Sequence, residues 1–253
     1  MVTIMKVIFN ADDFGYSKGV NYGIVEAYKN GAVRSTTIMA GMPGFDHAVE
    51  LAQENPGLGI GVHLTLTTGQ SVGGVYKTLT NASGEFNNLT EVERRANAGE
   101  IDLSEVETEY EAQIQKVLAA GIKPDHFDSH HHTHNLPGIV SVFLKLAKKY
   151  DVKVRIYNRA QLTGEFADIK TTEVFDDTFF GETATTQDLK LTLSACSVKS
   201  VEIMCHPAYV DNSVLTNSSY NTKRALELEV LTSSDLMEFI DENGMELCSF
   251  KEV

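Results

Sequence analysis

The sequence has little of what marks secreted or membrane-bound proteins. Its 253 residues contain only three cysteines, Cys196, Cys205 and Cys248, without a Cys-x-x-Cys spacing. We therefore expect buried free thiols rather than a disulfide framework or a thiolate zinc site. No stretch approaches the roughly 18 apolar residues of a membrane span, and residues 1–6 lead into the first expected strand without a signal-peptide core. These absences predict a cytoplasmic protein.

Positive charge is also scarce. The chain has 35 Asp and Glu against 21 Lys and Arg, which gives a formal net charge of −14. Such an acidic surface repels phosphate backbones and anionic membranes, so we expect neither a nucleic acid nor a membrane as partner. With 42% apolar residues and no visible linker or repeat, we predict a single domain over residues 1–253. The oligomeric state stays open, a homodimer included.

Short apolar runs alternate with helical patterns along the whole chain. Because alternating strands and helices favour a parallel sheet with right-handed crossovers, about eight repeats in 253 residues predict an α/β fold, a single TIM-like (β/α) barrel. In that fold the active site lies at the carboxyl ends of the strands. The expected strands are 6–10, 34–39, 59–66, 126–129, 153–156, 171–175, 201–205 and 246–250.

Helix ends and one long connection complete this prediction. Ser17 and Ser104 are expected to cap helices, Pro137 suits the first turn of another, and residues 226–240 are expected to form the last helix. Residues 70–103, rich in Gly, Asn and Thr, are too long for a simple connection. We interpret them as a loop excursion over one end of the barrel, and residues 211–221 are a smaller candidate of the same kind.

Polar residues cluster where four of the expected strands end. These clusters are Asp12-Asp13, His63, the tract from Asp128 to His134, and Cys205-His206. Each has an ordinary explanation when taken alone: paired acids often cap helices, a single histidine in an apolar strand is usually a hydrogen-bonded core residue, and a histidine tract is usually a solvated loop. Because all four fall at the same end of one barrel, we expect them to converge. A carboxylate with two imidazoles is a common ligand set for a divalent cation.

Five motifs in order resemble a known family. Together they are similar to the YdjC-like carbohydrate deacetylases, with the chitooligosaccharide deacetylase branch as the nearest match, and segment 226–233 also fits. The motifs are Asn10-Ala11-Asp12-Asp13-Phe14-Gly15, Ser35-Thr36-Thr37, Gly61-Val62-His63-Leu64, Phe127-Asp128-Ser129-His130-His131-His132 and Met204-Cys205-His206-Pro207-Ala208.

The resemblance implies a distorted (β/α) barrel that acts on N-acetylated sugars with one divalent ion, Mg²⁺ or Zn²⁺. It implies that Asp13, His63 and His130 bind the ion, that Asp12 is the general base and that His206 is the general acid. The residues themselves do not decide which of Asp12 and Asp13 holds the ion. The implied substrate is a small N-acetylated sugar, for example diacetylchitobiose or its 6-phosphate.

Elementary chemistry agrees with these roles. Amide hydrolysis needs a strong nucleophile, and a divalent cation lowers the pKa of bound water from 15.7 towards about 7. Asp12 would accept the water proton, backbone N–H donors would hold the oxyanion, and His206 would protonate the departing amine, leaving acetate and a free amine.

Three further residues are candidates for substrate binding. If residues 128–134 alternate as a strand does, His132 and His134 share a face with His130, and we expect them to contact the substrate or support the ligands. Arg155, with Arg159 and Lys153 nearby, can meet an anion on the sugar, although all three suit solvated surface charges equally well.

Other classes of function stay open at this stage. The same two-histidine, one-carboxylate set serves iron oxygenases, which usually have all-β scaffolds, and a non-catalytic metal or sugar binder is a third alternative. A thiol nucleophile at Cys205 is disfavoured because adjacent strand residues point apart, so that His206 cannot easily activate the sulfur.

Overall fold

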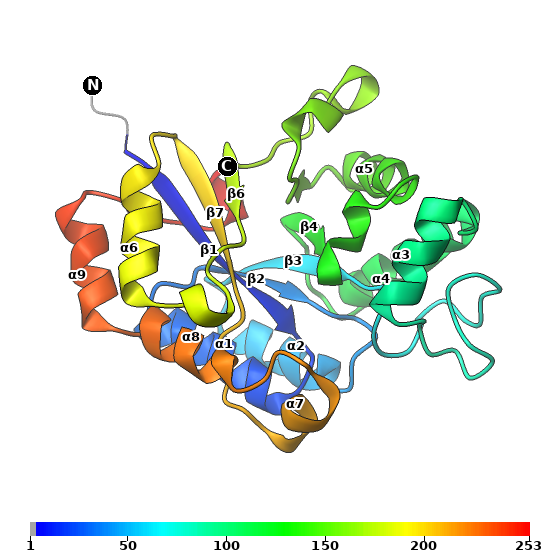
Figure 1. Cartoon of the computed structure of the whole chain (residues 1–253), viewed down its shortest axis with the longest axis horizontal. Coiled ribbons are helices and arrows are strands. Elements are labelled where there is room, and N and C mark those ends of the chain that lie inside the picture. The colour runs from blue at the N-terminus through cyan, green and yellow to red at the C-terminus, as the bar shows by residue number, and fades with distance from the viewer. Residues whose placement is uncertain (1–3) are drawn as a thin grey trace.

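A curled parallel sheet lies at the centre of the computed structural model, which describes residues 4–253 (Figure 1). Residues 1–3 lie outside it, and the expected absence of a signal sequence falls partly on them. The strands are β1 (Lys6–Phe14), β2 (Ser35–Ile38), β3 (Gly59–Leu64), β4 (His126–Ser129), β5 (Lys153–Val154), β6 (Val174–Asp176), β7 (Ser200–Cys205) and β8 (Glu246–Leu247).

The strand order confirms the predicted fold class. Neighbours pair in parallel in the order β5-β4-β3-β2-β1-β7-β6, and β8 pairs with the start of β1. Among the described residues no ladder joins β5 to β6, so the sheet curls without closing. The arrangement is a distorted (β/α) barrel, and all eight predicted strands are present, β4 with the predicted ends and the other seven with shifted ends.

Helices flank this sheet, α6 and α9 on the side of β7 and α3 to α5 on the side of β3 and β4 (Figure 1). The larger of two apolar clusters among the described residues reaches from Val7 to Ile240. Within residues 4–253 no helix has the length and apolar character that a bilayer span requires. The helices are α1 (Lys18–Asn30), α2 (Phe45–Glu54), α3 (Leu89–Ala98), α4 (Leu103–Ala119), α5 (Ile139–Tyr150), α6 (Thr186–Ala195), α7 (Asn212–Asn217), α8 (Lys223–Leu231) and α9 (Ser234–Glu242).

Helix ends were predicted less well than strands. Ser17 caps α1 as expected, accepting a hydrogen bond from the Val20 N–H at 3.2 Å. The prediction for Ser104 was wrong, because Asp102 caps α4 and Ser104 lies inside its first turn. Pro137 lies two residues before α5 rather than in its first turn.

Two longer segments also differ from the prediction. The last expected helix is broken, because Ser233 starts α9 with its own cap two residues after α8 ends. The excursion over residues 70–103 contains the unpredicted helix α3, held by an Asn88 cap, and α7 lies inside 211–221. A local capping residue thus begins a helix where composition alone suggested a loop.

Candidate active site

A cavity of about 610 Å³ opens among the loops that follow the carboxyl ends of the strands. Asp12, Asp13, His63, His130 and His206 all line it. The polar residues at the carboxyl ends of four separate strands therefore converge, as the sequence predicted.

Asp13 owes its position to an irregularity at the end of β1. The register between β1 and β2 shifts between Ala11 and Phe14, and Asp13 has a left-handed backbone with a φ of 73°. The Tyr16 N–H donates to the Asp13 carbonyl at 2.9 Å, which closes a turn at this point. Because the strand alternation is broken here, the adjacent side chains of Asp12 and Asp13 both reach the cavity.

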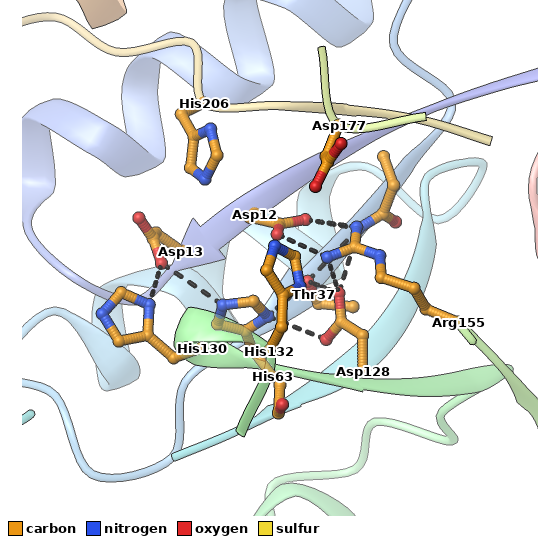
Figure 2. Close-up of polar contacts among 12 residues, drawn as sticks. Asp12, Asp13, Thr37, His63, Asp128, His130, His132, Arg155, Asp177 and His206 are labelled. Atoms are coloured by element: carbon orange, nitrogen blue, oxygen red, sulfur yellow. Dashed lines mark hydrogen bonds and ion pairs between the residues drawn. The ribbon is translucent and has the colours of Figure 1, made fainter. Parts of the chain in front are cut away.

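The side chains of His63 and His130 converge on the Asp13 carboxylate. Its Oδ1 lies 3.4 Å from His63 Nε2 and 3.0 Å from His130 Nδ1, and the three atoms lie within 4.8 Å of one another (Figure 2). Asp13 has no exposed surface, and its Oδ1 has no hydrogen-bond partner. A buried carboxylate oxygen between two imidazole nitrogens suits a divalent cation, so this group can hold a metal ion.

Asp128 orients the His63 ring from behind. The His63 Nδ1 lies 2.7 Å from Asp128 Oδ1, which leaves Nε2 facing Asp13. Burial lowers the pKa of His63, but the carboxylates of Asp128 and then Asp12 outweigh it and raise this pKa to about 10. A carboxylate behind a ligating histidine is the usual way in which proteins fix the tautomer and raise the basicity of a metal ligand.

Arg224, from α8, holds the other oxygen of Asp13. Its Nη2 donates to Asp13 Oδ2 at 2.7 Å, and its Nε donates to the Tyr220 carbonyl at 2.7 Å. Burial raises the pKa of Asp13, but Arg224 and then His130 hold it well below its usual range. Asp13 is therefore ionised, with only Oδ1 turned to the two histidines.

Asp12 has a different environment from its neighbour. The Arg155 guanidinium donates to both of its oxygens, at 2.6 and 2.7 Å (Figure 2). The Asn10 amide donates to Oδ1 at 2.9 Å. Asp12, His63 and Asp128 also lie close enough to hold an ion. The Arg155 guanidinium, however, lies 3.0 Å from Asp128 and also contacts Asp12. The positive charge beside this second group of residues is therefore already supplied by Arg155. Of the two aspartates, only Asp13 therefore has an oxygen that no arginine contacts.

The structure corrects the environment expected for Arg155. It is fully buried, and its Nε donates to Glu202 at 2.7 Å while its other nitrogens contact Asp12 and Asp128. The interpretation of Arg155 as a solvated surface charge was therefore wrong. The guanidinium that was expected to meet a substrate anion is paired instead with three carboxylates of the protein. Arg159 and Lys153 do not line the cavity.

The histidine tract does not alternate as a strand. β4 ends at Ser129, and residues 130–135 form a 3₁₀ turn in which His131 and His132 have positive φ angles of 54° and 53°. His132 lines the cavity, with its pKa lowered to about 4 by burial and then by Arg155. His134 turns into the core, where its Nδ1 lies 2.6 Å from Ser129 Oγ and its ring stacks on Phe143. The two histidines therefore do not share a face.

His206 directly follows β7 and lines the same cavity. Burial, and then the charge of Arg224, lower its pKa to about 3, so that the ring is uncharged at neutral pH. Its buried Nδ1 has no hydrogen-bond partner. The neighbouring Cys205 is buried and directs its Sγ to the Asn10 carbonyl at 3.3 Å, while burial raises the pKa of the thiol well above its usual range. Cys205 is thus a packed thiol, whereas Cys196 is partly exposed rather than buried.

Sequence reasoning missed two residues of α8. Arg224 holds Asp13, and Glu227, one turn further along, accepts hydrogen bonds from the His206 backbone N–H and the Tyr220 hydroxyl. Burial raises the pKa of Glu227 to about 7. Glu227 falls in segment 226–233, which fits the family, but no role was assigned to it. An Arg and a Glu spaced i, i+3 are typical of any solvated helix.

Comparisons of sequence identify the relatives of this chain. The profile of the family described as YdjC-like protein matches residues 6–242. A carbohydrate deacetylase of Brevibacillus brevis is 44% identical, and the match covers 98% of this chain and all of that protein. Carbohydrate deacetylase 1 of Listeria innocua is 43% identical, over 98% of this chain and all of the relative.

Two solved structures are similar to this chain in fold. A protein of Enterococcus faecalis V583, named for cellobiose-phosphate cleavage, has a TM-score of 0.89 and 33% identity, with 98% of each chain covered. The peptidoglycan deacetylase PdaC of Bacillus subtilis has a TM-score of 0.52 at 8% identity, covering 98% of this chain and 89% of that one, and shares the fold alone. This chain belongs to the YdjC-like family.

Proposed function

We propose that this protein is a metal-dependent hydrolase that removes the acetyl group from an N-acetylated sugar and releases acetate. One observation carries the proposal: the unpartnered Oδ1 of buried Asp13 between His63 Nε2 and His130 Nδ1. The carbohydrate deacetylases to which the chain is similar support the reaction class. We propose Mg²⁺ or Zn²⁺ as the ion, held by these three residues.

A divalent ion in this position would make a bound water acidic enough to be deprotonated at neutral pH and would polarise the acetyl carbonyl. Asp12 is the proposed general base. Burial raises its pKa, but Arg155 outweighs burial and keeps the pKa below its usual value, so that Asp12 is ionised. The bidentate contact with Arg155 also fixes its orientation, which leaves a free lone pair on an oxygen to take the proton.

His206 is the proposed general acid for the departing amine. Because the ring is uncharged in the free site, it must bind a proton before it can donate one. Negative charge that develops on the substrate oxygen during attack favours the imidazolium and raises the pKa of His206. His206 takes this proton from solvent and passes it to the amine nitrogen as the carbon–nitrogen bond breaks. Asp12 returns the water proton to solvent, and the products are acetate and a free amino sugar.

The size of the cavity supports a small oligosaccharide such as diacetylchitobiose. A volume of about 610 Å³ is in the range of small-molecule sites. Arg224 is the one Arg or Lys among the described residues that line the cavity, and it is already paired with Asp13. The lining therefore favours a neutral sugar, while the named cleavage of cellobiose-phosphate in the Enterococcus relative makes the 6-phosphate the second substrate to test.

A mass-spectrometric screen tests the proposal. The protein is incubated with N-acetylglucosamine, diacetylchitobiose and their 6-phosphates, with and without a chelator. The masses of the products are then measured to detect the loss of one acetyl group. We expect loss from at least one disaccharide, and none after chelation. Oxygen-dependent turnover with bound iron would favour an oxygenase instead, and binding of a sugar without acetyl loss would favour a non-catalytic protein.

A further inference from the structure

Phe180 is unusually exposed for an aromatic residue that lines a cavity. It follows β6, immediately before Gly181, which has a φ of 66°. About 43% of its surface is exposed. A large apolar side chain exposed in a cavity commonly marks a surface that a ligand covers.

Tyr220 supports this ring from behind. The two ring centroids lie 3.9 Å apart at an interplanar angle of 16°, a stacked arrangement. The Tyr220 hydroxyl accepts a hydrogen bond from the Gly181 N–H at 2.9 Å and donates to Glu227. The loop after β6 and the segment before α8 are thus joined, and hydrogen bonds hold the Tyr220 ring in place against Phe180.

The same pair lies beside the proposed general acid. The His206 ring is 5.7 Å from the Phe180 ring and 5.6 Å from the Tyr220 ring, in both cases edge to face. Glu227 binds the His206 backbone N–H as well as the Tyr220 hydroxyl, so one buried carboxylate sets the position of both. A ligand that covers Phe180 therefore lies next to His206.

We infer that Phe180, backed by Tyr220, is a stacking platform for the apolar C–H face of a pyranose ring. This inference rests on the proposed function and specifies its sugar subsite. Asp177 and Ser218 also line the cavity and offer hydrogen-bond groups to sugar hydroxyls. An aromatic face with carboxylate and hydroxyl neighbours suits a neutral sugar better than a purely apolar ligand.

The absence of tryptophan from the chain permits a direct test. In an Asp12→Asn background, which blocks the proposed turnover, Phe180→Trp introduces one fluorophore at the platform. We expect its emission to change in a saturable way with diacetylchitobiose. A matched control is Leu191→Trp in the same background, since Leu191 is 62% exposed on α6 and does not line this cavity. No change at position 180, while calorimetry shows the sugar bound, would overturn the inference.

Kinetics give a second, independent measurement. We expect Phe180→Ala to raise KM for the disaccharide by about 3- to 10-fold with a smaller change in kcat, and Phe180→Tyr to restore KM. Metal content should stay unchanged in both variants. An unaltered KM in folded Phe180→Ala protein would contradict the platform while the deacetylase proposal stands. Saturable binding of the sugar by the Phe180→Trp variant, with no acetyl loss by the wild-type protein, would support the platform and contradict the deacetylase proposal.

Discussion

The two sides of the cavity are built in different ways. On one side Asp13 and His63 stand at strand ends, fully or almost fully buried, and each is held by a second charged residue, Arg224 and Asp128. On the other side Phe180 and Tyr220 come from loops, and Phe180 is 43% exposed. Reactive groups need positions fixed by a packed core, whereas loops can differ between relatives without disturbing that core. We therefore expect changes on the first side to affect metal binding and kcat, and changes on the second to affect KM.

The largest effect should come from Asp13→Asn. Asparagine tolerates the left-handed backbone of this position, so the fold should persist. The neutral amide loses most of the attraction for a cation, and we expect both bound metal and turnover to fall to the level of chelator-treated protein. Metal analysis by mass spectrometry, together with acetate release, measures both. Retention of full metal content would remove Asp13 from the ligand set.

Asp12→Asn should separate chemistry from metal binding. We expect turnover to fall by about 10²- to 10⁴-fold, the usual contribution of a general base, with metal content nearly intact. The same two measurements apply. An equal loss of metal and turnover would mean that the roles of the two aspartates are assigned the wrong way round.

Arg224→Met should weaken metal binding through Asp13. Without its partner at 2.7 Å, Asp13 Oδ2 is free to turn, and residues that orient a metal ligand typically contribute 10- to 100-fold to affinity. We expect a loss of about that size in titration calorimetry with the metal alone. Arg94→Met is the matched control, because Arg94 forms an exposed pair with Glu91 and its side chain is 52% exposed. Equal metal affinity in both variants would assign Arg224 a purely structural role.

The smallest expected effect concerns the pH dependence of stability. Burial raises the pKa of Glu202 from 4.5 to about 7, against the opposing charge of Arg155. Between these values the folded protein holds a proton that the unfolded chain releases, so stability falls as pH rises through this window. The slope is at most about 1.4 kcal/mol per pH unit. In denaturant titrations from pH 5 to pH 7, Glu202→Gln should show a flatter dependence than the wild type. Parallel curves would contradict the raised pKa.

Local and long-range features of this molecule were not equally predictable from its sequence. All eight strands were predicted because buried apolar runs are a local signal. The convergence of Asp13, His63 and His130 followed from the barrel rule that strand ends meet. The separation of His132 from His134 was missed because it depends on positive φ angles within the tract, which alternation cannot anticipate.

Recognition of the family motifs had its own limits. It supplied roles for Asp12 and His206, and these stay predictions until the variants are measured. Arg224 and Phe180 lie outside the matched segments, and Glu227 lies in segment 226–233 but was given no role. The structure draws attention to them through an ion pair, a shared carboxylate and an exposed ring.

The sequence by itself determined the strands, their parallel arrangement and the set of residues at their carboxyl ends, because periodicity and burial are encoded within short segments. Only the tertiary structure decided which charges pair. Arg155 reaches Asp12 across 143 positions, and Arg224 reaches Asp13 across 211. Such pairings depend on where the curled sheet and α8 bring distant side chains together. The two adjacent aspartates therefore acquire different partners, and with them different proposed roles.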